Sequence, residues 1–220
     1  MRAWVRSNRG LLVFLLGLGL LRTAVADWNP IPSGSMRPTL LEGDVVLVSR
    51  TAYDLKVPLT DLSLARLGDP QRGDVVTFTS PRDGVRLIKR VVGLPGDVIA
   101  MHDEVLTVNG VLVAYSDAVR ADEPLHGATT PAVRATEHLG RDHTVQFLPA
   151  QPAMRSFGPT TVPRDHYFML GDNRDDSADS RYIGVVPRAL LIGRAHHVLV
   201  SADMTGHWLP RPGRFGLSIE

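Results

Sequence analysis

The sequence contains no cysteine and almost no lysine. The lack of cysteine excludes disulfide frameworks, thiolate zinc sites, iron–sulfur clusters and a cysteine nucleophile. Of the 24 cationic side chains only Lys56 and Lys89 are lysines, and the other 22 are arginines. Because arginine cannot lose its proton in a protein, a chain with this bias uses lysine where the choice matters. Neither sign of charge is in excess either: the formal net charge is +1, which argues against a nucleic-acid-binding protein.

The first 26 residues contain no acidic side chain and are typical of a membrane-targeting segment. Arg2, Arg6 and Arg9 precede the apolar run Leu11–Leu21, and such segments insert with their charged end in the cytoplasm. One interpretation is a cleavable signal peptide, because residues 24–26 read Ala-Val-Ala. The other is a retained anchor, although the run is short beside the roughly 20 residues that a spanning helix needs. By itself, this segment slightly favours cleavage.

The length of 220 residues fits one domain, or one domain plus a small lobe, and the pattern after the apolar run is mainly β. Short runs rich in β-branched residues are separated by Gly-Asp pairs, and Asn109-Gly110 is a strong two-residue hairpin signal. The strands predicted in this way are Val45–Ser49, Val75–Thr79, Val85–Val92, Val98–Met101, Val105–Val108, Val111–Tyr115, His166–Leu170 and His196–Val200. Between residues 116 and 164 the periodicity is weak, which predicts a loop-rich lobe inserted into the sheet.

Residues 31–40, IPSGSMRPTL, place two serines on either side of one glycine and between prolines. Gly34 lets the main chain pass close to a substrate carbonyl. A serine held in such a turn can be a nucleophile, while neighbouring N–H or hydroxyl groups face the developing oxyanion. An ordinary Ser/Gly/Pro turn explains this stretch equally well.

The strand predicted over residues 85–92 carries one of the two lysines. Strand alternation puts Lys89 on the same face as Val85, Leu87 and Val91. Burial on an aliphatic face disfavours the charged amine and lowers its pKa, as a lysine general base requires. The alternative, which this stretch alone favours, is an edge-strand lysine that reaches water.

Residues 171–184, GDNRDDSADSRYIG, are rich in aspartate but do not have the spacing of a calcium loop. Neither frame supplies both the required glycine and the terminal glutamate. In an extended segment Ser177, Asp179 and Arg181 share one face, so that an Asp–Arg pair holds the loop while the hydroxyl points at a partner. An acidic, solvated turn is the alternative.

Together, three stretches resemble the conserved boxes of bacterial type I signal peptidase (leader peptidase), a serine–lysine dyad family. They are residues 31–40, residues 72–78 with RLIKRVVGLPGDV at 86–98, and GDNRDDSADSRYIGVVP at 171–187. Their order and approximate spacing also match, and the boxes are too long for chance similarity.

The resemblance assigns roles to the residues that match. It implies that Ser35 is the nucleophile and Lys89 the general base. Ser33 is implied as the oxyanion donor with the Ser35 backbone N–H, and Ser177 as the hydroxyl that orients the lysine amine. Asp179 and Arg181 correspond to a supporting ion pair. Residues that match the family's shallow pockets for small side chains are Ile31, Pro32, Met36, Leu40, Leu87 and Ile88.

The resemblance also implies an architecture. It predicts a mainly β fold, with an antiparallel β-sheet catalytic domain formed by residues 27–115 and 166–220, and a small loop-rich accessory lobe at 116–165. One N-terminal transmembrane helix is expected to precede it, because family members keep the apolar segment as an anchor. Residues 1–9 would be cytoplasmic, and residues 10–26 would be the anchor and the start of the first strand, which takes in residues 22–26. The catalytic domain would lie on the outer, periplasmic side of the inner membrane.

This sequence departs from the family pattern in two places. Asn29-Pro30 stands where an aromatic or aliphatic pair is common, so the pocket for the substrate residue at −3 is in doubt. Residues 116–164 contain no motif that can be aligned with the family.

The implied function is a membrane-bound serine endopeptidase that cleaves signal peptides from exported preproteins after small residues (Ala-x-Ala). No cofactor, metal or nucleic acid is implied; the expected partners are preproteins and membrane lipids, and the expected state is a monomer. Three alternatives stay open: a conjugation-type processing peptidase with one dedicated partner, a self-cleaving repressor, and a catalytically silent signal-peptide-binding protein. A histidine-based triad is disfavoured, because none of the eight histidines lies in a matching motif.

Overall fold

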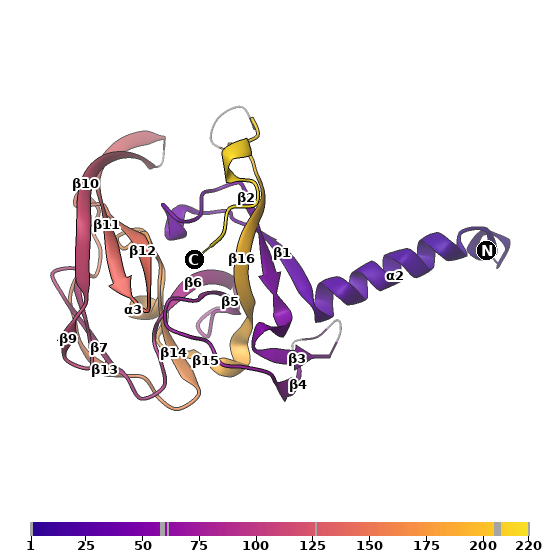
Figure 1. Ribbon diagram of the computed structural model, residues 1–220, viewed down its shortest axis with the longest axis horizontal. Coiled ribbons are helices and arrows are strands. Elements are labelled where there is room, and N and C mark those ends of the chain that lie inside the picture. Colours follow the sequence, from indigo (N-terminus) through magenta and orange to yellow (C-terminus); the bar gives the residue numbers. More distant parts are fainter. Residues whose placement is uncertain (1, 58–59, 61, 126, 205–207, 220) are drawn as a thin grey trace.

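The computed structural model describes residues 2–57, 60, 62–125, 127–204 and 208–219. A helical segment, α1 (Arg2–Ser7) and α2 (Arg9–Ala24), precedes a body made almost entirely of antiparallel strands. Figure 1 shows α2 projecting away from the sheets, with strands β10 to β12 at the opposite side of the body.

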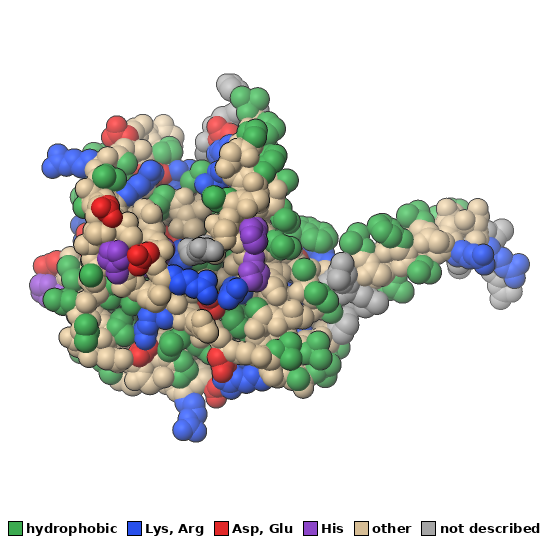
Figure 2. All heavy atoms as spheres, viewed as in Figure 1, with side chains coloured by type: hydrophobic (Ala, Val, Ile, Leu, Met, Phe, Trp, Pro, Cys, Tyr) green, Lys and Arg blue, Asp and Glu red, His purple; other side chains and the backbone are tan. Residues whose placement is uncertain are grey.

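Hydrophobic side chains run along α2 and basic ones gather at its free end (Figure 2). Within the part of the chain that the structure describes, no helix combines the length and hydropathy of a membrane-spanning helix, and α2 has 16 residues. The transmembrane helix therefore stays a prediction. The expected strand over residues 22–26 is wrong: α2 continues to Ala24, and β1 begins only at Ala26. Leucine, arginine and alanine are strong helix formers, so the helix continues through Arg22.

A seven-stranded antiparallel sheet brings the three motif-bearing stretches together. Its strand order is β1-β2-β16-β5-β6-β14-β15. The bounds are β1 Ala26–Pro30, β2 Asp44–Ser49, β5 Val75–Thr79, β6 Arg86–Gly93, β14 His166–Leu170, β15 Val186–Pro187 and β16 Leu191–Ser201. The serine motif follows β1, Lys89 lies on β6, and the aspartate-rich segment follows β14.

Two smaller sheets flank this one. The four-stranded sheet has the order β13-β7-β8-β9, and the hairpin β3–β4 forms a sheet of two strands. Their bounds are β3 Asp54–Lys56, β4 Ser63–Arg66, β7 Val98–His102, β8 Val105–Val108, β9 Val111–Leu112 and β13 Phe157–Thr161. The predicted hairpin is confirmed: Asn109 and Gly110 have φ of 54° and 78°, as a two-residue turn between twisted strands requires.

The predicted loop-rich lobe is wrong, because this stretch forms a three-stranded antiparallel sheet. Its strands are β10 (Ala114–Leu125), β11 (Ala128–Leu139) and β12 (Arg141–Phe147). Figure 1 shows the long β10–β11 ribbon extending past the end of β12. The inward positions of these strands hold small or ionised residues, such as Ala132, Glu123 and Glu137, all at most 2% exposed. Hydrophobic periodicity is therefore absent from a sheet that is nonetheless well formed.

Alternate residues of β5 and β6 belong to different apolar clusters. Val76 and Val91 belong to a cluster with Leu87, whereas Val75 belongs to another, against which Ile88 packs. The two faces of β6 are therefore those that strand alternation predicts, and both are buried around Lys89.

Candidate active site

The structure brings Ser35 and Lys89 into direct contact. Ser35 lies in the single 3-10 turn Gly34–Met36, and Lys89 lies in the middle of β6. The Lys89 Nζ donates a hydrogen bond to the Ser35 Oγ over 2.5 Å, although 54 residues separate them in the chain. Ser35 is half-buried and Lys89 is 2% exposed, so the amine meets the hydroxyl away from bulk water.

Burial lowers the pKa of Lys89 to about 8. Loss of solvation is the largest cause, and the carboxylates of Asp179, Asp172 and Asp176 partly oppose it by favouring the ammonium. The cross-strand partner of Lys89 is the aliphatic Val76. A pKa near 8 leaves a useful fraction of neutral amine at neutral pH, and a neutral amine beside a hydroxyl can accept its proton.

Ser33 precedes the turn and is exposed, with extended backbone angles of φ −141° and ψ 157°. Its hydroxyl makes no capping hydrogen bond to the turn. The side chain is therefore available for a group that approaches Ser35 from solvent, as an oxyanion donor must be.

The turn that carries Ser35 is held by Asn173, a residue that motif reasoning did not single out. The Asn173 Nδ2 donates to the Gly34 carbonyl over 3.1 Å, and its backbone N–H donates to the Ser35 carbonyl over 3.2 Å. A Cβ at Gly171 would lie 2.4 Å from that same Ser35 oxygen and 2.3 Å from the Ser177 Oγ. Glycine is thus required where these two segments touch.

Asp179 and Arg181 form the predicted ion pair, in a geometry that differs from the prediction. The segment is not extended: Asp179 is the N-cap of the short helix α3 (Ser180–Ile183), and Arg181 lies in its first turn. The Asp179 carboxylate accepts from the Arg181 Nε and Nη2, both over 2.8 Å, and from the Gly171 N–H over 3.1 Å. The pair therefore fixes the glycine beside which Ser177 lies.

Ser177 lies next to the dyad without bonding to it. Its Oγ is buried and has no hydrogen-bond partner among the residues described. The predicted contact with the lysine amine is not made in this structure. A buried, unpartnered hydroxyl is costly, and this one lies where the segment after β14 touches the Ser35 backbone.

Comparison with known proteins gives a consistent result. The family model described as "Signal peptidase, peptidase S26" matches residues 1–200. The chain belongs to this family. "Signal peptidase I" of Pseudomonas aeruginosa is 40% identical over 212 residues, covering 90% of this chain and 73% of that protein. "Probable signal peptidase I-2" of a Synechocystis species is 35% identical over 200 residues, covering 87% and 71%. A crystal structure of a signal peptidase I from Enterococcus faecalis is 34% identical, covering 58% of this chain and 97% of that chain with a TM-score of 0.36. The S26 relationship makes this chain a signal peptidase enzyme.

The six apolar residues expected to line the substrate pockets of this S26 peptidase differ in their exposure to solvent. Ile31, Met36 and Leu40 are at most 2% exposed and belong to one core cluster, so they offer a ligand no surface. Pro32 is exposed, and Leu87 and Ile88 are half-buried. The pocket role of these residues stays a prediction, and Ile31, Met36 and Leu40 could shape a pocket only from behind its surface.

The first half of β6 has one open edge in this signal peptidase. β5 pairs with residues 86–90 on one side, while β14 pairs on the other side only from Arg90 onward. Among the residues described, no strand pairs with the second edge of residues 86–88. This open edge leads directly to Lys89.

Asn29, which stands at a position where the sequence departs from the family, is buried beside the open edge. The Arg86 Nη1 donates to the Asn29 Oδ1 over 2.9 Å and to the Asp27 Oδ2 over 3.0 Å. The Asn29 Nδ2 is buried and has no partner among the residues described. The lining beside the first residue of β6 is therefore polar.

Within the described ranges, no group of three or more His, Asp or Glu residues is arranged to hold a metal ion.

Proposed function

We propose that this peptidase removes signal peptides from exported preproteins after small residues (Ala-x-Ala), with Ser35 as nucleophile and Lys89 as general base. The observation that supports this most directly is the 2.5 Å hydrogen bond between the Lys89 Nζ and the Ser35 Oγ. It is supported further by the lowered pKa of a lysine that is 2% exposed.

In this mechanism neutral Lys89 takes the Ser35 proton while the Oγ attacks the carbonyl of the small residue. The Ser33 hydroxyl and the Ser35 N–H stabilise the oxyanion. The ammonium of Lys89 then gives its proton to the leaving amine, and the neutral amine activates the water that hydrolyses the ester. Ser177 supplies the hydroxyl that orients Lys89 between these transfers, and the Asp179–Arg181 pair holds that loop in place.

The substrate binds as an added strand on the open edge of residues 86–88, which supplies main-chain donors and acceptors. In an extended peptide the −1 and −3 side chains point to the same side, toward the enzyme. Pro32, Leu87 and Ile88 supply the apolar surface there, and the buried Ile31, Met36 and Leu40 keep the pockets shallow by filling the space behind. Small residues at −1 and −3 follow from this geometry.

We propose that α2 is retained as a membrane anchor, with residues 1–9 in the cytoplasm and residues 27–115 and 166–220 forming the catalytic domain on the periplasmic side. Several of the described apolar side chains of α2 are exposed: Val13 is 69% exposed and Phe14 64%. The Arg22 guanidinium stacks 4.3 Å from the Trp28 ring, an arrangement suited to a membrane–water interface. The chain should stay in the membrane pellet after alkaline carbonate washing. A soluble mature chain that begins at Asp27 would contradict the anchor.

The test uses the full chain in detergent with a preprotein that carries an Ala-x-Ala site. Cleavage should occur after the second alanine of the site, and Ser35→Ala should abolish it. Several unrelated preproteins should all be cleaved, whereas a processing peptidase with one dedicated partner would cleave only that partner. A catalytically silent binding protein would bind the preprotein and leave it intact.

A further inference from the structure

A carboxylate of the accessory sheet is buried against the loop that carries Ser35. Glu123, on β10, is 1% exposed. Its Oε1 accepts from the Arg37 Nη1, and its Oε2 accepts from the Arg134 Nη2 on β11 over 2.5 Å. One buried acid is thus shared by two guanidinium groups, one from its own sheet and one from the residue two positions after Ser35.

The Arg37 side chain in turn packs on the backbone next to the nucleophile. A Cβ at Gly34 would lie 3.1 Å from the Arg37 Cδ and 2.9 Å from the Glu42 Oε1. The Arg37 Nε also donates to the Glu42 Oε2 over 2.7 Å, and its backbone N–H donates to the Gly34 carbonyl over 3.0 Å. The contact between Glu123 and the Arg37 guanidinium therefore fixes the side chain that packs against the turn Gly34–Met36.

A second connection runs from the same sheet to the same turn. The Arg134 Nε donates to the Gln146 Oε1 over 2.9 Å, and the Gln146 main chain pairs with residues 172–174 through two hydrogen bonds of 2.8 Å. Asn173 lies in that segment and holds the Gly34 and Ser35 carbonyls. The accessory sheet therefore reaches the turn from two sides, and Glu123–Arg134 is the junction of both routes.

We propose that Glu123 is a positioning residue for catalysis: through Arg37 it holds the Ser35 turn at the distance at which the Oγ meets Lys89. This inference rests on the proposed role of Ser35. It also gives the three-stranded sheet β10–β12, whose sequence shows no family motif, a part in the reaction. Loss of the carboxylate leaves the buried Arg37 guanidinium and the half-buried Arg134 guanidinium without the anion between them, and we expect the Arg37 side chain to move away from Gly34.

The expected consequence is kinetic. A displacement of about 1 Å in a reacting group costs on the order of 100-fold in rate, so Glu123→Gln should lower kcat by about 10- to 100-fold. KM should stay within about twofold, because the substrate edge of β6 makes no contact with Glu123. The pH midpoint of kcat/KM should not move, since the burial of Lys89 is unchanged.

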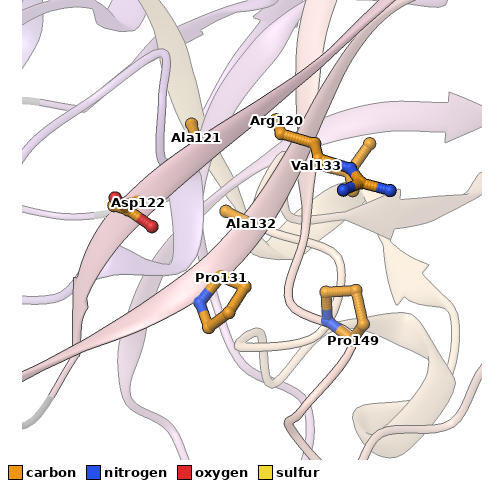
Figure 3. A pocket seen from close by; sticks show the side chains of 7 residues that line it. All are labelled: Arg120, Ala121, Asp122, Pro131, Ala132, Val133 and Pro149. Carbon is orange, nitrogen blue, oxygen red and sulfur yellow. The ribbon is translucent and has the colours of Figure 1, made fainter.

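The opposite face of the same ribbon supplies a matched control. Asp122 is exposed and lines a hollow of about 430 Å³ with Arg120, Pro131 and Pro149 (Figure 3). Strand alternation turns it away from Glu123. Asp122→Asn removes the same charge from the same strand one residue earlier, and it should leave kcat and KM unchanged.

The experiment measures single-turnover cleavage of an Ala-x-Ala preprotein by the detergent-solubilised full chain at 25 °C, per folded molecule, with Tm recorded for each variant. The set is Ser35→Ala, Glu123→Gln, Asp122→Asn, Arg37→Met and the double variant Arg37→Met with Glu123→Gln. The two single changes act on one link, so the double variant should lose no more than about twofold beyond the worse single variant.

A purely structural role would lower the Tm of Glu123→Gln and leave its single-turnover rate within twofold of wild type, and this result would overturn the inference. If Glu123→Gln does not fold, Arg134→Gln decides: its guanidinium is 34% exposed, and its loss should slow single turnover severalfold. An unchanged rate for Arg134→Gln would equally overturn the inference. An active Ser35→Ala variant would instead overturn the proposed function.

Discussion

Lys89 and Arg90 are consecutive on β6 and equally buried, at 2% and 0% exposed, yet the two faces of the strand give them opposite surroundings. Arg90 has a carboxylate partner: its Nε and Nη2 donate to the two Asp172 oxygens over 2.8 and 2.7 Å. Lys89 is hydrogen-bonded to a neutral hydroxyl instead. The face that carries Arg90 therefore stabilises a permanent positive charge, whereas the face that carries Lys89 favours loss of its proton.

Arg90 has the surroundings of a structural cation, and Lys89 has those that the proposed general base needs. A bidentate Arg–carboxylate pair is rigid and cannot exchange protons near neutral pH. A buried ammonium with no carboxylate in contact is destabilised relative to the free amine. The two acids that most favour the ammonium, Asp179 and Asp172, are paired with Arg181 and Arg90, so they moderate the pKa of Lys89 without restoring it.

The largest expected effect comes from exchanging the two cation types. Lys89→Arg keeps a positive charge but has no neutral form to accept a proton, so the variant should fold and show no detectable cleavage of an Ala-x-Ala preprotein. Arg90→Lys, the matched change on the other face, should reduce stability and keep activity, because its partner Asp172 takes no part in proton transfer. An active Lys89→Arg enzyme would show that another group is the base.

The next largest effect is expected for hydroxyls on the catalytic side. Ser33→Ala should lower kcat by about 100- to 1,000-fold with little change in KM, since an oxyanion donor acts in the transition state. Ser177→Ala should also slow cleavage without unfolding the protein. Ser156→Ala, an exposed serine that bonds Asp103, is the control and should be neutral. Full activity in both test variants would refute the site assignment.

The pH dependence of kcat/KM should depend on the Lys89 amine and not on Arg90. The protonated amine cannot act as a base, so kcat/KM should rise with pH along a limb centred near 8, falling about tenfold per unit below it. Arg90→Lys should leave this midpoint in place. A limb centred near the ordinary lysine value of about 10.4 would show a solvated amine and remove the reason for placing Lys89 at the centre of the mechanism.

The remaining effects are on stability rather than on turnover, and they should have opposite signs. The folded-state pKa of Lys89, about 8, lies below its unfolded value of 10.5. Burial of the charged lysine therefore lowers the free energy of unfolding by its full amount below about pH 8. This cost disappears as the pH rises to about 10.5. Lys89→Met should therefore stabilise the protein by about 3 kcal/mol at pH 6.5, seen as a higher Tm. Arg90→Met should destabilise it by about 3–5 kcal/mol, because Asp172 is left as an unpaired buried charge. A stabilised Arg90→Met variant would show that the two faces of β6 do not differ in how they stabilise a positive charge.

Local pattern predicted much of this arrangement. Alternation along residues 85–92 predicted Val85, Leu87 and Val91 as neighbours on the Lys89 face; Leu87 and Val91 do share one cluster, whereas Val85 precedes β6 and is exposed. The hairpin predicted from Asn109-Gly110 is confirmed. The roles of Ser35, Lys89 and their supporting groups came from resemblance, and they stay proposals.

Long-range charge pairing could not be predicted in this way. The accessory sheet was taken for loops because acids occupy inward positions where periodicity looks for apolar residues; Glu137, for example, is buried against Arg174 with contacts of 2.7 and 2.8 Å. Asn173, Arg37 and Glu123 act through partners tens of residues away, and nothing in their local sequence identifies those partners. The extended form expected for residues 177–181 was wrong because Asp179 caps a helix instead.

The short open edge of β6 also bears on self-association. An unpaired strand edge can template the edge of a second copy, and long, flat, apolar edges are the usual origin of sheet-to-sheet aggregation. Here the open stretch is only residues 86–89, it begins with a charged residue whose side chain is 47% exposed, and β14 closes it from Arg90 onward. An open edge this short offers a second copy little main chain to pair with, so it is a poor template for edge-to-edge association.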